Sequence, residues 1–383
     1  MLHECRHQEK EPPSESKPMK IICEREKFVH PFQLTAGVAA TRDVKPVLQN
    51  VKIKAFDGKV TLMATDSELG IRIDVPDVQI EQEGEAIIPT RRMKMILQEC
   101  SDKTLNIEAD AIQMIVKTER SRFQLATQSA EEFPEIAPFE EASYHQIPAN
   151  TFRELIRRTV FATDTESTRY ALGGVLLEMT GEIVSGVATD GRRLAFQTIR
   201  GESVNDHVTE NSAILPPKSL QLLERAIADQ ESIKVNISSH NALFCAENIV
   251  VFTRLIEGRF PRWRTIIPDT QGRCCIAIQV GTLYPAVRQA AIVTSEKQPG
   301  VIFHFSEGKL TLKAQGAEIG ESLVEIPIAF DYQDIQIKLD PGFVSDFLRV
   351  LQPESSIQLF VLEDNPFVCC TEDGFTYVLM PIT

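Results

Sequence analysis

The feature that most constrains this chain is a long-period internal repeat. Ala64, Ala188 and Ala314 hold the same place in three similar segments, at intervals of 124 and 126 residues. Solenoid proteins repeat every 20–50 residues or so, so a period this long indicates three copies of a whole domain. The matching segments are GKVTLMATDSELGIRI (58–73), EIVSGVATDGRRLAFQ (182–197) and GKLTLKAQGAEIGESL (308–323).

The 383 residues divide accordingly. Residues 1–18 are polar and proline-containing, and we expect them to form a flexible tail. The acidic stretch at 135–145 and the segment PDTQGR are the best candidate linkers. The sequence therefore predicts three domains after the tail, at 19–143, 144–270 and 271–383.

Each third follows one plan of helices and short strands. VKIKAF and KVTLMAT alternate around the turn Asp57-Gly58, which predicts a hairpin. A first helix opens the second third near residue 150, with Thr151 and Glu154 placed for a capping box. A second helix follows near 91–100, 217–228 and 341–351, the last capped by Asp340. Two helices and about eight antiparallel strands per unit predict an α+β fold.

Composition excludes several classes of protein. No run of 18 apolar residues exists, and the N-terminus has no apolar signal segment, so we expect a cytoplasmic protein. The net charge of −14 argues against a surface that coats nucleic acid as a whole. None of the eight cysteines forms a Cys-x-x-Cys pair, so we expect reduced, mostly buried thiols.

The predicted helices nevertheless carry basic side chains, while acidic residues concentrate elsewhere. A solvated helix face is the ordinary explanation of such charges. A second explanation is geometric: twelve helices, from two copies of the chain, spaced about 8–10 Å apart would line a ring with a hole about 25 Å wide. Such a hole admits duplex DNA, whose phosphates the basic side chains would contact without reading bases. The residues concerned include Lys45, Arg91, Arg92, Arg153, Arg157, Arg158 and Lys218.

Eight motifs in order give the chain a family resemblance over residues 19–383. It resembles the bacterial DNA polymerase III β subunit, the β sliding clamp. The motifs are MKIICEREKF (19–28), R-x-x-x-P-V-L-x-N (42–50), ATDxxLGI (64–71), RSRFxL (120–125), TRYALGG (168–174), ATDGRRLA (188–195), GRFPRWRTIIP (258–268) and YVLMPI (377–382).

The resemblance implies three clamp domains per chain and a closed ring formed by a head-to-tail homodimer. Such a ring encircles duplex DNA regardless of sequence and tethers the replicative polymerase as a processivity factor. It has no catalytic centre and no cofactor, and an ATP-driven loader places it on DNA. Its partners are the polymerase α subunit, the loader, other polymerases and repair proteins.

The resemblance also implies a pocket that receives short partner peptides between the second and third domains. An apolar groove containing Met suits leucine and aromatic side chains of a peptide. Thr265, where the family often has Arg, and the end of the chain at Thr383 depart from the pattern. The pocket residues are Leu172, Thr189, Gly191, Arg192, Arg193, Leu194, Pro261, Ile266, Val378, Met380, Pro381 and Ile382.

Two further sets of residues follow from the same resemblance. Arg42, Arg169 and Tyr170 match positions at the DNA, where Glu166 replaces the common amide. The predicted dimer seam consists of Arg120, Arg122, Phe123 and Leu125 of the first domain, which meet Ile292 and Val293 of the partner's third domain.

Two other functions compete with a clamp. An acidic metal-dependent hydrolase would use Asp66 and Asp190, but Asp190 precedes Gly191 in a predicted turn that it can hydrogen-bond. No Walker A loop, GxSxG elbow or HExxH motif is present, and the histidines lack the spacing of metal ligands. A scaffold that binds peptides but not DNA is the other alternative.

Overall fold

The structure is a computed structural model, and it describes residues 18–41, 45–164, 170–209, 213–295, 300–316, 319–362 and 365–382. The described chain contains six α-helices and 26 strands. It forms two compact units, of which the first comprises residues up to 138 with 248–250 and the second comprises the remainder. No described helix is long and apolar enough to cross a membrane.

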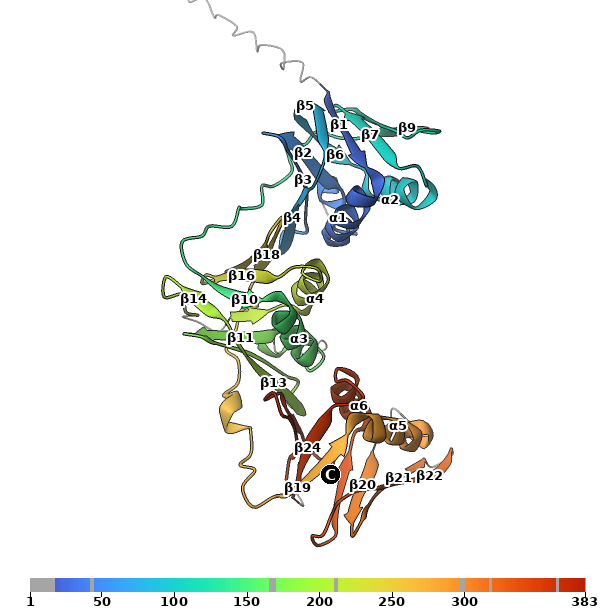
Figure 1. Cartoon of the computed structure of the whole chain (residues 1–383), viewed down its shortest axis with the longest axis vertical. Helices are drawn as coiled ribbons and strands as arrows, with labels where there is room; N and C mark the ends of the chain where they lie inside the picture. Colours follow the sequence, from blue (N-terminus) through green and yellow to red (C-terminus); the bar gives the residue numbers. More distant parts are fainter. Residues whose placement is uncertain are drawn as a thin grey trace, which may run out of the picture. The chain divides into compact units, whose positions relative to one another are not determined.

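The first unit contains helices α1 (Arg25–Val38) and α2 (Thr90–Glu99) and two antiparallel runs of strands (Figure 1). One sheet has the order β5-β1-β7-β8-β9, and the other run has the order β4-β3-β2-β6. Strand β9 lies at an edge of its sheet. The strands are β1 (Met19–Glu24), β2 (Val51–Phe56), β3 (Lys59–Thr65), β4 (Leu69–Val75), β5 (Gln79–Gln82), β6 (Gly84–Ile88), β7 (Thr104–Ala109), β8 (Gln113–Lys117) and β9 (Arg122–Ala126).

The second unit contains both remaining repeats. Helices α3 (Ala149–Val160) and α4 (Pro217–Ala226) belong to the second repeat, and α5 (Val280–Ala290) and α6 (Pro341–Arg349) to the third. The strands of the second repeat are β10 (Tyr144–Pro148), β11 (Val175–Thr180), β12 (Ile183–Thr189), β13 (Arg193–Arg200), β14 (Glu202–Val204), β15 (Ala213–Leu215), β16 (Ser232–Ile237), β17 (Asn241–Ala246) and β18 (Ile249–Arg254). Those of the third are β19 (Cys274–Gln279), β20 (Val301–Ser306), β21 (Lys309–Gly316), β22 (Gly320–Pro327), β23 (Ile335–Leu339), β24 (Ser356–Val361), β25 (Phe367–Thr371) and β26 (Thr376–Leu379).

The element order confirms the threefold repeat. The first two repeats have the same succession: a strand, a helix, a 3-10 turn, five strands, a helix and three strands. The third differs in having four central strands within the described residues. The predicted hairpin is β2–β3, and Asp57 and Gly58 both adopt positive φ (52° and 72°), as its tight turn requires.

The two predicted helix caps had different outcomes. The Asp340 side chain accepts a hydrogen bond from the Gly342 amide at 2.8 Å, so that cap is confirmed. The capping box in the second repeat was wrong, because the cap position is Pro148, three residues before Thr151, and α3 begins at Ala149. The Thr151 hydroxyl donates to the Pro148 carbonyl, and Glu154 pairs with Arg158 one turn later.

One continuous sheet joins the second and third repeats. Strand β13 pairs antiparallel with β26, which gives an eight-stranded sheet of order β15-β11-β12-β13-β26-β25-β24-β19. A core that includes Leu176, Val187, Leu194, Phe260 and Val378 draws residues from both repeats. Helices α3 and α4 pack together, as do α5 and α6, and Figure 1 draws all four on one side of the sheets of this unit.

A buried histidine pair lies where β10 meets the 205–209 loop. His145 and His207 are 0% and 5% exposed, and their Nδ1 atoms lie 2.7 Å apart. His207 Nε2 accepts from the Ile237 amide, so a neutral His207 donates from Nδ1 to His145, whose Nε2 donates to the Gly181 carbonyl. Both rings are satisfied only while neutral, because a proton added to either one places two donors face to face.

We predict that this pair makes the second unit less stable in mild acid. Burial lowers the pKa of both rings below the ordinary value of 6.5, and the charge of His145 lowers that of His207 further. At a pH between the lowered pKa of the folded protein and the ordinary pKa of the unfolded chain, the unfolded chain binds more protons. The free energy of unfolding therefore falls as pH drops below about 6.5. Urea unfolding measured from pH 8 to 5.5 should show this slope of stability against pH. Replacing both histidines by Leu should flatten it, whereas His240→Gln, at an exposed position, should not. An unchanged slope in the double variant would contradict the assignment.

Candidate functional site

The β12–β13 turn and its flanks position five of the twelve predicted pocket residues. Asp190 Oδ1 accepts from the amides of Arg192 and Arg193 at 2.9 and 3.0 Å, and Gly191 adopts a positive φ of 88°. The Thr189 hydroxyl donates to the Arg193 carbonyl at 2.6 Å, which closes the turn. The predicted turn role of Asp190 is therefore confirmed.

The corresponding aspartate in the first repeat has the same role. Asp66 Oδ1 accepts from the amides of Glu68 and Leu69 at 3.1 and 2.8 Å. One carboxylate thus accepts backbone hydrogen bonds and shapes a turn in each of two repeats. A hydrolase that uses the ATD aspartates as a pair finds no support in this arrangement.

Arg193 links the second repeat to the third. Its guanidinium reaches Asp190 at 3.0 Å and Asp346 of α6 at 2.7 Å, and it donates to the Phe161 carbonyl at 2.8 Å. The same group lies 4.3 Å from the ring centre of Phe343. Only 10% of this side chain is exposed, so all of these contacts are shielded from water. Arg193 is therefore a structural part of the junction.

An apolar surface forms around the β13–β26 pairing. Leu194 lies opposite Val378 in the register, and both are buried beside Phe260 and Trp263. The Met380 amide donates to the Arg192 carbonyl at 2.9 Å, which carries the chain past the end of β13. Met380 itself is 46% exposed. The junction therefore presents a flexible apolar side chain to solvent directly beside a buried core.

The other predicted pocket residues surround this centre. Leu172 is buried and its carbonyl accepts from the Asp164 amide, while Pro261 is half-buried and its carbonyl accepts from Trp263. Ile266 is 40% exposed. Pro381 and Ile382 are half-buried, and the Ile382 amide donates to the Lys338 carbonyl at 2.8 Å.

Phe343 is a member of this surface that the sequence did not indicate. The guanidinium of Arg192 lies 5.0 Å from its ring centre, and that of Arg193 lies on the same ring. Phe343 sits in the first turn of α6, about 150 residues from either arginine. Phe260 and Trp263 lie within the motif GRFPRWRTIIP. Their aromatic side chains could have indicated from the sequence that they belong to this surface. Thr265, the departure from the family pattern, is exposed and donates to the Arg262 carbonyl.

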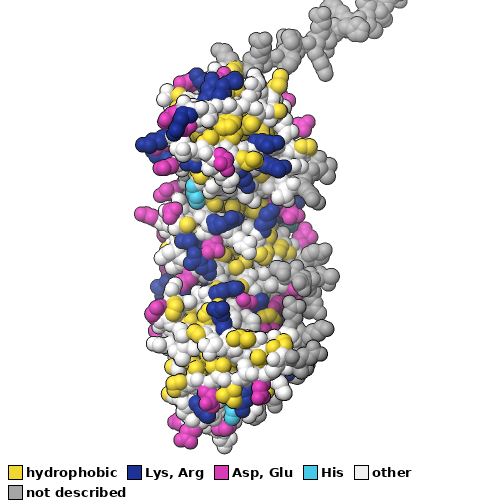
Figure 2. Space-filling model, turned by 90° about the vertical axis from the view of Figure 1, so that its right-hand side faces the viewer, with side chains coloured by type: hydrophobic (Ala, Val, Ile, Leu, Met, Phe, Trp, Pro, Cys, Tyr) yellow, Lys and Arg dark blue, Asp and Glu magenta, His cyan; other side chains and the backbone are white. Residues whose placement is uncertain are grey.

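The predicted DNA-facing residues are distributed over several helices. Arg91 and Arg92 on α2, Lys218 on α4 and Lys45 are exposed. The view onto the helical side in Figure 2 shows groups of Lys and Arg side chains among hydrophobic ones. Arg42, Glu166, Arg169 and the side chain of Tyr170 lie outside the described residues.

Two arginines of α3 tie that helix to α4. Arg153 donates to the carbonyls of Glu224 and Ala228 at 3.1 and 3.2 Å, near the C-terminal end of α4. Arg157 pairs with the Glu224 carboxylate at 2.6 Å and its side chain remains 50% exposed. Both stay accessible at the surface of the helix pair.

Arg158 does not face solvent, and its predicted place among the DNA-facing residues is corrected. It is 7% exposed and binds Gln197 at 2.8 Å and Asp373 at 2.7 Å, with its guanidinium over the Phe375 ring. The physical reason is helical period: position 158 follows Leu155 by three residues, which turns it toward the buried side of α3.

The predicted seam residues lie on and beside edge strand β9 in the first repeat and in the 3-10 turn Ala291–Val293 in the third. On β9, Phe123 and Leu125 are half-buried and alternate with exposed Arg122. Arg120 pairs with Asp102 at 3.1 Å, while most of its side chain is exposed. In the third repeat, Ile292 is 74% exposed, and β22 is an edge strand of the sheet β22-β21-β20-β23.

Comparison with known proteins accounts for nearly the whole described chain. Family models of the DNA polymerase III beta subunit match residues 19–137 (N-terminal domain), 146–262 (central domain) and 264–383 (C-terminal domain). The beta sliding clamps of Haemophilus influenzae and Escherichia coli K12 are each 29% identical, over 95% of this chain and 100% of theirs. Solved sliding clamps of Bacillus subtilis and Pseudomonas aeruginosa, each 26% identical, match 96% of this chain and 100% of theirs with TM-scores of 0.88 and 0.87.

Adjacent arginines in the turn should have opposite roles, which substitution can separate. Arg193→Ala removes one partner of shielded ion pairs, so we expect a loss of about 3–5 kcal/mol in the free energy of unfolding. Arg192→Ala, at an exposed position, should cost less than about 1 kcal/mol. Urea unfolding measures both. Equal losses in the two variants would show that Arg193 does not hold the junction.

Proposed function

Because the chain belongs to the DNA polymerase III beta subunit family, we propose that it is a DNA sliding clamp that tethers the replicative DNA polymerase to duplex DNA. The observation that carries this is the agreement of three successive family domains with a threefold repeat of one fold. Neither the hydrolase nor the scaffold accounts for that agreement along the chain.

The proposed DNA contact is electrostatic and independent of sequence. Exposed Arg91, Arg92 and Lys218 project from helices, as phosphate contacts require. The chain as a whole carries a charge of −14, so its other surfaces repel DNA. Enclosure of the duplex, rather than affinity alone, would then retain the protein on DNA.

We propose that two copies close the ring through the open edges β9 and β22. An unpaired edge strand offers free backbone donors and acceptors to another chain. Arg122 on β9 and Glu321 on β22 have opposite charges. Phe123, Leu125, Ile292 and Val293 would supply a small apolar contact at the same seam, which a loader can open.

The junction of the second and third repeats is the proposed docking site for partner peptides. Buried Leu194 and Val378 form its floor, and exposed Met380 and Ile266 offer apolar contact to an entering side chain. Arg192, held over Phe343, adds a cation at the rim. The polymerase α subunit, the ATP-driven loader, other polymerases and repair proteins would share this site. In this proposal the protein acts in the cytoplasm, needs no cofactor and catalyses no reaction of its own.

A topological experiment tests the clamp. The protein should elute near twice 42.9 kDa and, after loading, remain on nicked circular DNA but leave when the circle is cut. Arg91→Glu with Arg92→Glu should reduce loading, because two phosphate contacts are reversed on α2. The matched control is Arg200→Glu with Arg254→Glu, which reverses two exposed strand residues and should load normally.

Different results would identify the alternatives. Indifference to DNA topology would contradict a clamp. Normal processivity in the α2 variant together with peptide binding would favour the scaffold.

The peptide site is tested by removing its exposed methionine. Met380→Ala should weaken a bound peptide carrying Leu and Phe by about fivefold to thirtyfold, the value of burying most of one apolar side chain. Deleting 380–383 should abolish binding while leaving the dimer intact. Met95→Ala is the control, because Met95 is 48% exposed against 46% for Met380. Loss of the dimer on deletion would show that this segment belongs to the seam instead.

A further inference from the structure

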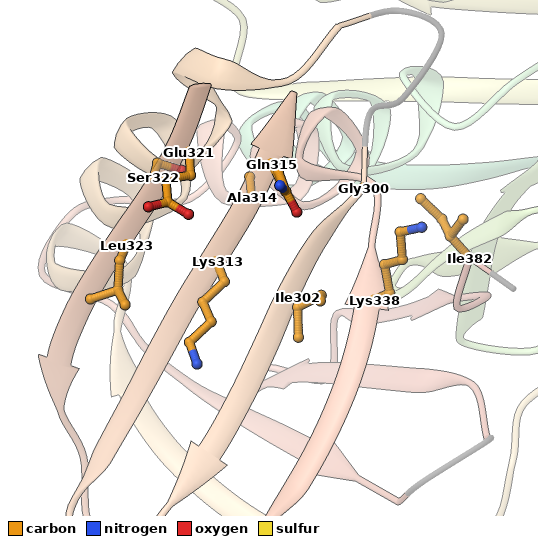
Figure 3. A pocket seen from close by; sticks show the side chains of 10 residues that line it. All are labelled: Gly300, Ile302, Lys313, Ala314, Gln315, Glu321, Ser322, Leu323, Lys338 and Ile382. Carbon is orange, nitrogen blue, oxygen red and sulfur yellow. The ribbon is translucent and has the colours of Figure 1, made fainter. Parts of the chain in front are cut away.

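A hollow of about 780 Å³ lies on the third repeat, outside the apolar junction. It opens on the sheet β22-β21-β20-β23, on the face whose residues alternate with the buried ones (Figure 3). Helix α5 contacts β21 and β22, and the core side chains Phe303, Leu312 and Leu339 point away from the hollow into that layer. Within the described chain, no element covers the outer face.

The strand register sets a regular pattern across this face. Leu323 lies opposite Lys313, Lys313 opposite Ile302, and Ile302 opposite Lys338. One row across four strands therefore alternates apolar and basic side chains. Figure 3 shows Lys313 and Lys338 on either side of Ile302. Strand β20 separates β21 and β23, which carry the two lysines, so these two strands lie about 9.5 Å apart.

Both ammonium groups are available to a ligand. No described acidic group lies within 4.0 Å of Lys313 or Lys338. Glu325, whose pKa is lowered mainly by Lys309 and to a smaller extent by the charge of Lys313, is engaged by Lys309 at 2.6 Å. The stem of Lys338 lies over Gly300, where an added Cβ would come within 2.3 Å of its Cε. The glycine thus makes room for the lysine at the edge of the hollow.

The exposed apolar groups indicate what kind of ligand fits. Ile302 is 37% exposed and Leu323 is 61% exposed, so the row offers apolar surface between the charges. A phosphate backbone has no apolar group to place against this surface. A peptide with acidic and apolar side chains matches both features.

We propose that this hollow binds an acidic amphipathic segment of a partner, flanking the peptide that enters the junction. Two carboxylates seven residues apart on a helix are separated by about 10.5 Å, with an apolar residue at the third or fourth position between them. Ile382, a predicted pocket residue, also lines the hollow, so one partner chain can reach both sites. The inference rests on the proposed function and extends its peptide site.

Fluorescence anisotropy with the full chain tests the proposal through four labelled peptides. The first carries only the short Leu–Phe motif, and the second adds an extension with Glu at two positions seven apart and Leu between. The third has Gln in place of both Glu, and the fourth is the acidic extension alone. Extensions are placed on either side of the motif in separate peptides.

The acidic extension should tighten binding about threefold to tenfold over the first and third peptides, as two exposed ion pairs allow. The gain should vanish in about 0.5 M salt. Lys338→Gln and Lys313→Gln should each remove most of it while leaving the short peptide unchanged. Gln336→Glu is the control: it changes net charge by the same amount on the same strand, outside the hollow.

Several results would contradict the inference. No gain from either extension, a gain retained in Lys338→Gln, or an equal loss in Gln336→Glu would overturn the inference. So would displacement of the acidic extension by a single-stranded oligonucleotide at lower concentration, or lysine-dependent self-association of the chain. If the short peptide fails to bind, the proposed docking site at the junction is wrong, although the clamp itself is not contradicted. The extension alone must then still bind weakly and depend on Lys338 for the inference to survive.

Discussion

The antiparallel pairing of β13 with β26 is the interaction on which the second unit depends. It turns the sheets of two repeats into a single eight-stranded sheet and brings Leu194 against Val378. Two arginines reinforce it. Arg193 reaches Asp346 on α6, and Arg158 reaches Asp373 beyond β25. Because both guanidiniums are largely shielded from water, each depends on its carboxylate to compensate its buried charge.

Exposed basic side chains on the helices contrast with the acidic composition of the whole chain. The net charge is strongly negative, yet exposed basic residues recur on helices in both compact units. Several of these cations also have local partners: Arg153 and Arg157 both engage the C-terminal part of α4. A phosphate contact would therefore compete with existing hydrogen bonds at α3, whereas Arg91 and Arg92 project from α2 as exposed side chains. The basic residues of α2 and α3 are therefore not equivalent as DNA contacts, although the repeated sequence pattern predicts the same role for both helices.

Much of the fold could be predicted because its signals are local. The hairpin around Asp57-Gly58, the Asp340 cap and the turn role of Asp190 all depend on residues a few positions apart. The capping box at Thr151 failed for a local reason as well, since a strand ending at Pro148 passes directly into the helix. The candidate site was only partly predictable. Its motifs named Leu194 and Met380, but nothing near Phe343 indicated that two arginines would lie on its ring.

The sequence by itself determined the threefold repeat, the succession of helices and strands, and the turns that connect them. These depend on periodicity and on residues that favour particular backbone angles, which a linear pattern records. Only the tertiary structure decided that Arg158 is buried, that Phe343 completes the junction, and that Lys313 and Lys338 flank Ile302 on an open sheet face. Each of these depends on strand register or on packing between segments far apart in the chain, and no local pattern encodes which distant partner a side chain will meet.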